Sequence, residues 1–270
     1  TYDPARVYAF RTRFFMNALN GTDQLRQRVA FALSQILVVS SRDIYDGPGM
    51  SVYVDLLGRN AFSNFRTLLE EITLNPAMGN YLDMVNNDKT NGTTRVPNEN
   101  YAREIMQLFS IGLEELNADG TPLLDAQGKP IPTYGQAEIG EFARVFTGYT
   151  YSSAANPNGP ATGKQARYYG HPMIPYPATG TTGHDTGAKT LLNGTVLPAN
   201  QTPQTDVDAA VRNVFMHPNT GPYVGKQLIQ RLVTGNPSPA YVGRVAAVFA
   251  DNGAGVRGDL QAVVRAILLD

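Results

Sequence analysis

The sequence predicts a mainly α-helical fold, an irregular multi-helix bundle with a small β-hairpin and one long ordered loop excursion. Apolar residues recur with the helical period over most of residues 1–113 and 206–270. Between residues 151 and 205, Pro, Gly, Asn and Thr interrupt that period. Because 42% of the 270 residues are hydrophobic, the chain can bury a large core. We therefore expect a single helical domain over residues 1–270, whose body consists of the two periodic segments.

The first periodic segment contains several predicted helices. Asp23 is placed to cap a helix that continues through Leu37 with apolar residues at helical spacing. Asn75 and Pro76 are a typical cap and first turn of another helix. Shorter helices are predicted at residues 52–57, 62–74 and 76–85.

The stretch 97–112 predicts a capped amphipathic helix. Asn98 is a favourable N-cap, and Glu99 follows it where the helix dipole favours a negative charge. Glu99, Arg103 and Gln107 share one face, with Asn100 and Glu104 beside them. The apolar arc opposite consists of Tyr101, Ala102, Ile105, Met106, Leu108, Phe109, Gly112 and Leu113.

This polar face allows two interpretations. It is either a solvated surface with an i,i+4 ion pair between Glu99 and Arg103, or a face covered by the loop that follows. In the second case a partly buried carboxylate such as Glu104 would be tuned for proton transfer.

The middle of the chain changes character. Turn signals at residues 117–121 and 125–129 predict a hairpin, or a pair of extended arms, over residues 114–134. Their Asp and Asn spacing is close to that of a calcium loop but lacks the terminal Glu of an EF-hand. A helix is predicted at 137–148. The excursion 151–205 follows, with a short strand pair expected at 190–197.

The C-terminal segment returns to helices separated by turns with Gly, Pro and Asn. Pro239 suits a helix start, and Gly253 and Gly255 fit a loop before the last helix. The predicted helices cover residues 207–215, 223–233, 240–249 and 260–269.

Composition excludes several classes of function. The net charge is −1 and the basic residues are dispersed, which argues against a nucleic-acid partner. The chain has no cysteine, so it has no disulfide and no thiol nucleophile. No apolar run approaches the ~20 residues that a membrane span requires. Polarity comes largely from Asn, Thr, Ser and Gly, as is common in exported bacterial proteins, so we expect a periplasmic or secreted location.

Several segments spread along nearly the whole chain carry a family resemblance. They are 24–35, 75–78 (Asn-Pro-Ala-Met), 97–112, 143–148, 184–190, 217–219 (His-Pro-Asn) and 225–232. In this order and spacing they resemble the bacterial family catalogued as domain of unknown function eighteen-hundred. The resemblance implies a mostly helical and often exported protein, and no established activity.

Common catalytic motifs are absent. The sequence contains no G-x-S-x-G elbow, no P-loop, no dinucleotide fingerprint and no H-E-x-x-H. Three histidines leave little room for a histidine-rich metal site. We therefore predict no cofactor and no metal ligands, while a carboxylate-bound calcium or magnesium ion stays open because hard cations use oxygen ligands.

Carboxylate acid/base chemistry is the enzymatic option that remains. We predict a cluster between the 99–107 face, the helix 137–148 and the loop around His184. Its catalytic residues would be Glu104 as general acid/base, Glu141 as its partner, and His184 with a carboxylate from Glu99, Glu104 or Glu141. The expected substrate-binding residues are Glu99, Asn100, Arg103, Arg144, Asp185 and Lys189.

Two functions fit this cluster. In the first, the protein is a carboxylate-based hydrolase or a binder of a polymeric or glycan-like substrate. In the second, it is a surface-assembly or binding module without enzymatic activity. In that module the same charges form a structural network, and His184 and Asp185 pin the loop. A glycan or cell-surface partner suits either function, and the oligomeric state is left open.

Overall fold

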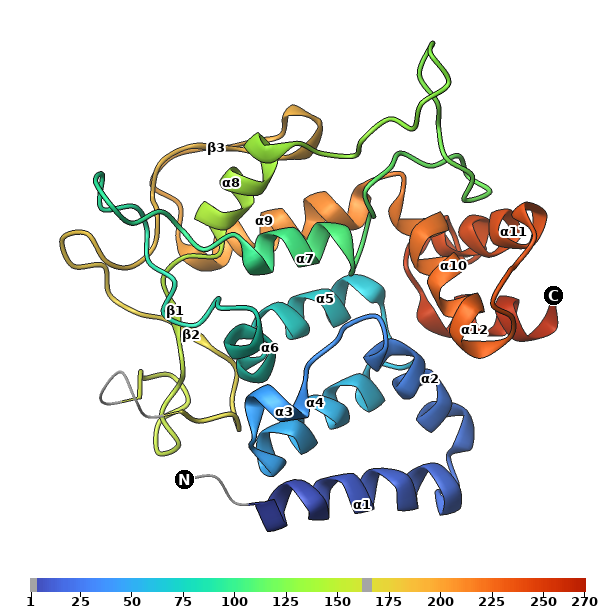
Figure 1. The fold of residues 1–270 in the computed structure, drawn as a ribbon, viewed down its shortest axis with the longest axis horizontal. Coiled ribbons are helices and arrows are strands. Elements are labelled where there is room, and N and C mark those ends of the chain that lie inside the picture. The colour runs from blue at the N-terminus through green and yellow to red at the C-terminus, as the bar shows by residue number, and fades with distance from the viewer. Residues whose placement is uncertain (1–3, 162–166) are drawn as a thin grey trace.

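Helices dominate the computed structural model, which describes residues 4–161 and 167–270 (Figure 1). The prediction of a mainly α fold is confirmed. Within the described ranges the helices are α1 (Pro4–Asn20), α2 (Gln24–Ser34), α3 (Ser41–Ile44), α4 (Gly47–Arg59), α5 (Phe65–Thr73), α6 (Pro76–Tyr81), α7 (Asn100–Gln107), α8 (Gln136–Val145), α9 (Pro203–Met216), α10 (Thr220–Leu232), α11 (Pro239–Ala250) and α12 (Leu260–Leu269).

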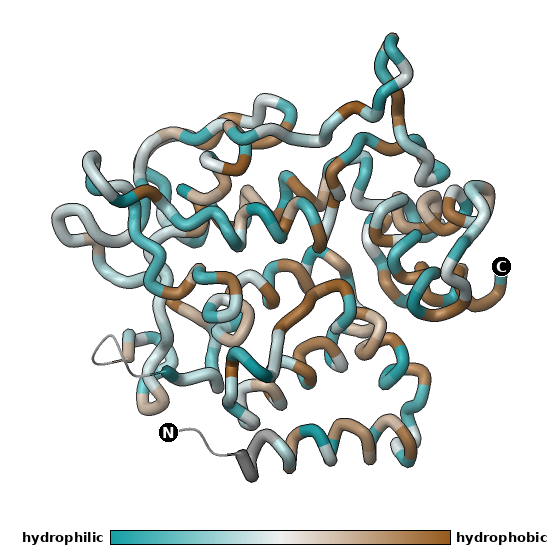
Figure 2. Tube along the Cα trace, viewed as in Figure 1, coloured by the Kyte–Doolittle hydropathy of each residue, from teal (hydrophilic) through white to brown (hydrophobic). Residues whose placement is uncertain are grey.

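Hydrophobic residues concentrate in the helices, whereas the peripheral loops are mainly hydrophilic or neutral (Figure 2). This distribution reflects the amphipathic period by which the helices were predicted. No helix among the described residues is both long enough and apolar enough to cross a membrane.

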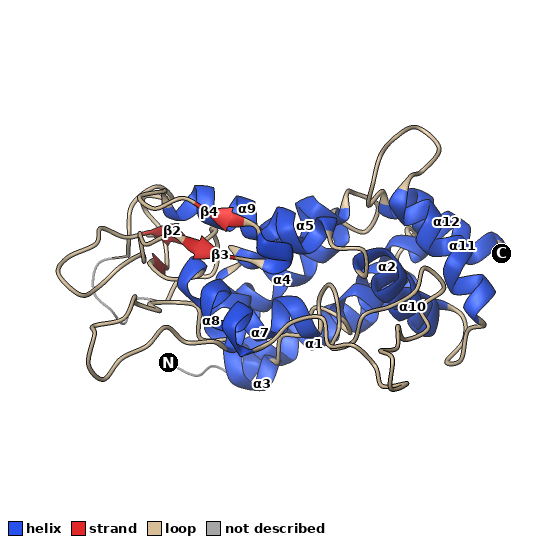
Figure 3. Cartoon of the chain, turned by 90° about the horizontal axis from the view of Figure 1, so that it is seen from above, coloured by secondary structure: helices blue, strands red, loops and turns tan. Residues whose placement is uncertain are grey.

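The strands gather at one end of the molecule (Figure 3). β1 (Tyr149–Thr150) pairs antiparallel with β2 (Ile174–Pro175), and β3 (Lys189–Thr190) pairs antiparallel with β4 (Val196–Leu197). A 3₁₀ turn, η1 (Leu192–Gly194), joins β3 to β4. The strand pair expected at residues 190–197 is confirmed.

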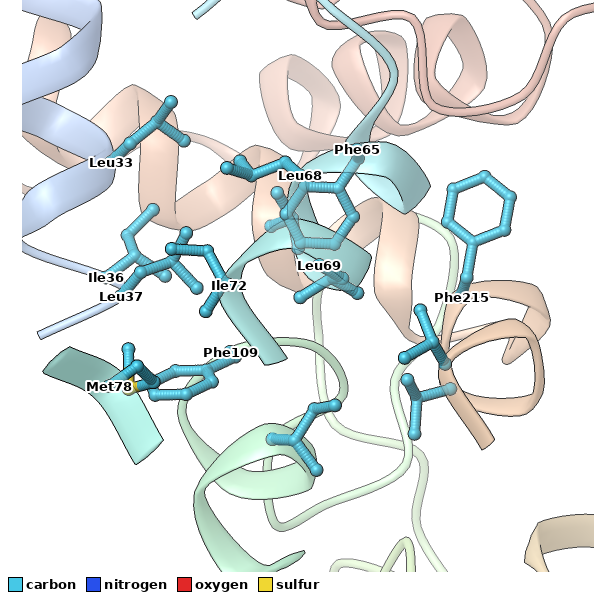
Figure 4. Close-up of a cluster of buried hydrophobic side chains, with 14 of the residues drawn as sticks. Leu33, Ile36, Leu37, Phe65, Leu68, Leu69, Ile72, Met78, Phe109 and Phe215 are labelled. Atoms are coloured by element: carbon cyan, nitrogen blue, oxygen red, sulfur yellow. The ribbon is translucent and has the colours of Figure 1, made fainter. Parts of the chain in front are cut away.

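The core is centred on α5, which packs against α4, α6 and α9. Its Leu68, Leu69 and Ile72 are fully buried (Figure 4). Phe65 at its start meets Phe249 of α11 with ring centroids 5.7 Å apart. Each fully buried side chain of this size stabilises the fold by about 1.5–3 kcal/mol. Helix α5 therefore links the N-terminal helices to the C-terminal ones.

Helices α10, α11 and α12 pack on one another, and α10 also contacts α2 and α9. The starts of α11 and α12 follow local sequence signals: Ser238 and Asp259 accept hydrogen bonds from backbone N–H groups, and Pro239 occupies the first turn. The predicted helix 260–269 has the observed bounds of α12.

Helix α7 is shorter than the predicted capped helix. It begins at Asn100, so Glu99 and not Asn98 occupies the N-cap position, and Asn98 Oδ1 instead accepts the N–H of the first helical residue at 2.8 Å. The helix ends at Gln107. Beyond residue 108, the backbone N–H groups of this turn bond to carbonyls five or six residues back instead of four, and the turn finishes at Gly112, which has φ +74°. A Cβ at Gly112 would lie 2.6 Å from the Tyr223 ring, so this turn requires glycine.

The segment 113–134, here called the arm, follows this turn and projects from the helices (Figure 1). Its backbone forms isolated antiparallel bridges and two tight turns in place of regular strands. Asp119 and Asp125 each accept backbone N–H groups within their own turns. Hydrogen bonds from Thr121 lower the pKa of Asp119.

The long excursion is tied to the body at Asp88. Asp88 Oδ1 accepts hydrogen bonds from the Tyr176 hydroxyl and from the Gly183 N–H, the latter at 2.7 Å. Asp88 Oδ2 also pairs with Arg95 at 3.3 Å. We call this set of contacts the Asp88 clamp. It holds the chain that leads into His184.

Candidate functional site

The polar face of α7 carries an ion pair at the surface. Arg103 Nη2 lies 3.0 Å from Glu99 Oε2, and both side chains are more than one third exposed. Gln136 at the start of α8 donates to Glu99 Oε1 at 2.8 Å. Asn100 donates to Asp83 at 3.3 Å. A pair this exposed stabilises the fold by at most about 1 kcal/mol. This part of the face therefore fits the first interpretation, a solvated surface with one ion pair.

Glu104, on the same helix, has a different environment. Its Oε2 is buried and has no hydrogen-bond partner among the described residues. Burial raises the pKa of Glu104, and the nearby charge of Arg103 opposes that rise. Its side chain is therefore a carboxyl group that holds its proton to a higher pH than an ordinary glutamate.

Two tyrosines lie close to Glu104. Burial raises the pKa of Tyr134, and the charge of Glu104 raises it further against the opposing charge of Arg103. Burial also raises the pKa of Tyr223, with a smaller contribution from Glu104. Within the described chain, the Tyr134 hydroxyl is buried without a partner, as is Glu104 Oε2. Unpartnered groups of this kind are uncommon in proteins and call for a functional or structural explanation.

A pocket of about 440 Å³ lies between α7, α10 and the arm, and its lining includes Tyr223 but not Glu104 or Tyr134. Tyr223 forms part of its wall and donates to the Gln107 carbonyl at 2.8 Å. Lys226 makes no ion pair with any described residue. The lining consists of Gln107, Leu108, Gly112, Leu113, Glu114, Leu116, Gly120, Pro122, Tyr223, Lys226, Gln227 and Gln230.

Asn219 fixes the arm that forms one wall of this pocket. Its fully buried carboxamide accepts the Leu116 N–H at 2.9 Å and donates to the carbonyls of Ile111 at 2.9 Å and Glu114 at 2.7 Å. Sequence reasoning did not assign Asn219 a role, although the His-Pro-Asn motif that contains it was among the family segments.

Glu141, Arg144 and Asp185 form a second group, which is fully paired. Arg144 binds Glu141 at 2.8 Å and Asp185 at 3.0 Å. Glu141 Oε2 also accepts the Thr190 N–H at 3.0 Å. Burial alone would raise the pKa of Asp185, but the hydrogen bonds from Arg144 and Gly187 lower it overall. The group joins α8 to the loop around β3.

His184, Lys189 and Asp206 form a third group, which we call the buried triad. Asp206 Oδ2 lies 2.9 Å from His184 Nε2 and 2.6 Å from Lys189 Nζ, and the three side chains are 4%, 1% and 1% exposed in the order His184, Lys189, Asp206. His184 Nδ1 lies 3.0 Å from the Thr147 carbonyl, and Lys189 Nζ also donates to two loop carbonyls. Neither His184 nor Lys189 is accessible to a substrate.

The backbone around the buried triad is tight. Gly148, with φ +83°, lies against His184, and a Cβ at this glycine would approach the His184 backbone N to 2.5 Å. The carboxylate partner that sequence reasoning sought for His184 is Asp206 of α9, a residue it had not named. Within the described chain, none of the three expected partners bonds to His184. Glu99 accepts a hydrogen bond from Gln136, Glu141 accepts one from the Thr190 N–H, and Glu104 makes no described contact with His184.

The predicted cluster is therefore divided. Across residues 4–161 and 167–270, no hydrogen bond or ion pair joins Glu104 to Glu141 or His184. The structure brings Arg144, Asp185 and Glu141 together and, next to them, His184 with Lys189, whose Nζ donates to the Asp185 carbonyl at 2.6 Å. Glu104 lies with Arg103 and the two tyrosines, so any acid/base role falls to it without Glu141.

In the part of the chain that is described, no group of three or more His, Asp or Glu side chains is arranged to bind a metal ion. The arm carboxylates of Asp119 and Asp125 face backbone N–H groups of their own turns.

Comparison with protein families decides the classification. The family model described as protein of unknown function (DUF1800) matches residues 4–270, essentially the whole chain. The chain belongs to this family. Neither curated proteins nor solved structures gave a match. The resemblance inferred from the sequence segments is confirmed, and the DUF1800 description carries no activity.

Proposed function

We propose that this DUF1800 chain binds a glycan-like or other polymeric polar substrate in the pocket between α7, α10 and the arm, and hydrolyses it with Glu104 as general acid. The observation that carries the proposal is the unpartnered Glu104 Oε2 of a carboxyl group with a raised pKa, near Tyr223, which lines the pocket. Of the three predicted catalytic residues, Glu141 and His184 are paired elsewhere, which leaves Glu104 for proton transfer.

In the proposed step Glu104 donates its proton to the leaving oxygen, and the water that adds to the other fragment returns a proton to the Glu104 carboxylate. A carboxyl group with a raised pKa keeps its proton to a higher pH than an ordinary glutamate and can donate it. Near Glu104, the buried Tyr134 hydroxyl also lacks a partner among the described residues, and the charge of Arg103 stabilises the ionised carboxylate that results. Amide side chains and the leucines of the lining supply the polar and apolar contacts that a sugar ring requires.

Glu104→Gln tests this role. Glutamine keeps the shape but cannot donate a proton, so we expect glycan hydrolysis to fall by about 10²–10⁴-fold while binding changes little. Reducing-end release and isothermal titration with a panel of soluble glycans measure the two effects.

The control is Asp55→Asn on α4, which removes an exposed carboxylate outside the pocket and should leave both quantities unchanged. Hydrolysis that survives Glu104→Gln refutes the acid role. Failure of every glycan to bind refutes the substrate class.

The same variant has a predictable effect on stability. Because burial raises the folded-state pKa of Glu104, the unfolded chain loses this proton first as pH rises, and the wild type loses stability in that interval. Below the unfolded pKa both states are protonated and the penalty vanishes. We expect Glu104→Gln to melt at the same temperature as the wild type near pH 4 and above it at pH 7. A lower melting temperature at pH 7 would instead make Glu104 a structural residue.

A non-enzymatic assembly or binding module is the second candidate. Two observations favour it: the sealed buried triad, and the exposed apolar side chains of α1, where Phe15 is 62% and Leu19 is 74% exposed. This candidate predicts self-association that Leu19→Ser weakens, together with no turnover of any glycan. Sedimentation velocity across a hundredfold range of concentration measures the first.

We also propose that the protein acts outside the cytoplasm. The polarity of the composition, which comes from Asn, Thr, Ser and Gly, and the export that the family resemblance implies support this location. Fractionation of the native host, with antibodies against the chain, tests it. Recovery of the protein only in the cytoplasmic fraction would refute it.

A further inference from the structure

A second pocket, of about 500 Å³, lies away from Glu104, between α4, α5, α9 and residues 169–172. The three helices lie close together in Figure 3, and α5 packs against both of the others. Apolar side chains form much of its surface, including Val52, Leu56, Leu74 and Pro76. Its size and mixed lining are typical of a site for a small ligand.

The charges around this pocket are mainly negative. Glu70, Glu71 and Asp208 contribute three carboxylates and Arg59 one guanidinium to the lining, and Arg66 beside the pocket pairs with Glu70 at 2.7 Å. Arg59 pairs with Glu71 at 3.1 Å, but the two side chains are 62% and 39% exposed, so the pair is weak and exchangeable. The Asp208 carboxylate accepts a hydrogen bond from Gln204 at 2.7 Å and makes no ion pair with any described residue. Three carboxylates against the two guanidinium groups of Arg59 and Arg66 leave the site with a net negative charge that favours a cation.

His171 adds an unused hydrogen-bonding group. Its Nδ1 is buried and has no partner in the described part of the chain, although the ring packs edge-on against Tyr168 at 5.1 Å. A buried nitrogen without a partner is unfavourable because its hydrogen bond to water is not replaced. A ligand N–H that reached His171 Nδ1 would supply the missing partner.

We propose that this pocket binds a primary ammonium group carried on a short hydrocarbon chain. Asp208, which makes no ion pair with any described residue, neutralises the cation, His171 Nδ1 accepts one of its N–H groups, and the methylene chain lies on Leu56 and Leu74. A free polyamine and the side chain of a lysine residue share this chemistry. The site is independent of the hydrolytic role of Glu104.

Isothermal titration with 1,5-diaminopentane tests the proposal, and pentane-1,5-diol is the uncharged ligand of equal length. We expect the diamine to bind and the diol not to bind. Asp208→Asn should weaken diamine binding at least tenfold, because a hydrogen bond to a charged group contributes more than about 1.4 kcal/mol. His171→Phe, which keeps the ring on Tyr168, should weaken it several-fold. Raising the salt concentration should weaken it as well.

The matched control is Asp55→Asn, which removes an exposed carboxylate of α4 outside the pocket and should change nothing. Equal binding of the diol, or unchanged affinity in both Asp208→Asn and His171→Phe, would overturn the proposal, as would no binding of the diamine at millimolar concentration. Titration with spermidine and with Nα-acetyl-lysine methylamide then separates the two sources of the ammonium group.

Discussion

Replacing Asp206 by alanine is expected to lower the melting temperature by about 6–20 °C. Asp206 is the carboxylate of the buried triad, and its removal leaves Lys189 charged and unpaired at 1% exposure. Breaking a buried ion pair from one side costs about 3–5 kcal/mol. In a chain of this size each kcal/mol shifts the melting temperature by roughly 2–4 °C. Differential scanning calorimetry at pH 7 measures the effect.

Two controls identify the cause. Asp208→Ala removes a carboxylate two positions further along α9 that is only half-buried, so its effect should be much smaller. The double variant Asp206→Leu with Lys189→Met replaces the pair by apolar side chains and should recover much of the loss. A shift of about 2 °C corresponds to a loss of about one kcal/mol or less in the free energy of unfolding. If Asp206→Ala melts within about 2 °C of the wild type, the triad does not stabilise the fold.

Asn219→Ala is expected to destabilise the fold by about 2–5 kcal/mol, from three lost hydrogen bonds whose buried partners are left unsatisfied. It should also weaken ligand binding in the α7–α10 pocket at least tenfold, because the freed arm no longer forms one wall. Calorimetry gives the first quantity. Hydrogen exchange of residues 113–124 shows whether the arm has come loose.

Asn117→Ala is the matched control for Asn219→Ala. Asn117 is an exposed asparagine on the arm itself, where it bonds only to its own turn. We expect its exchange pattern and melting temperature to stay close to those of the wild type. Arm amides that remain protected in Asn219→Ala would show that other contacts hold the arm.

The helices were largely predictable because their information is local. An apolar period and a cap such as Pro239 specify α11 and α12 without knowledge of the rest of the chain. Helix α7 shows where local information ends. Its apolar period continues past Gln107, but the Asn219 carboxamide and the Tyr223 ring capture the chain that follows. Both residues lie more than a hundred positions away.

The candidate site was predicted less well, for a similar reason. The Arg144–Asp185 and Lys189–Asp206 contacts join residues 41 and 17 positions apart, and nothing in their spacing distinguishes a sealed pair from a catalytic one. Asp206 lies in the first turn of α9, where an acidic residue already has a local explanation in the helix dipole. Its role in the buried triad becomes apparent only when His184 is placed beside it.

The Asp88 clamp has a consequence for how the long excursion behaves as a polymer. Because Asp88 holds Tyr176 and Gly183, and Asp206 holds His184 and Lys189, the chain between residues 176 and 189 is divided into short closed segments. Closing a segment costs entropy that grows only with the logarithm of its length, so each tie makes the next one easier to form. This part of the excursion should therefore resist proteases until the helical body itself unfolds.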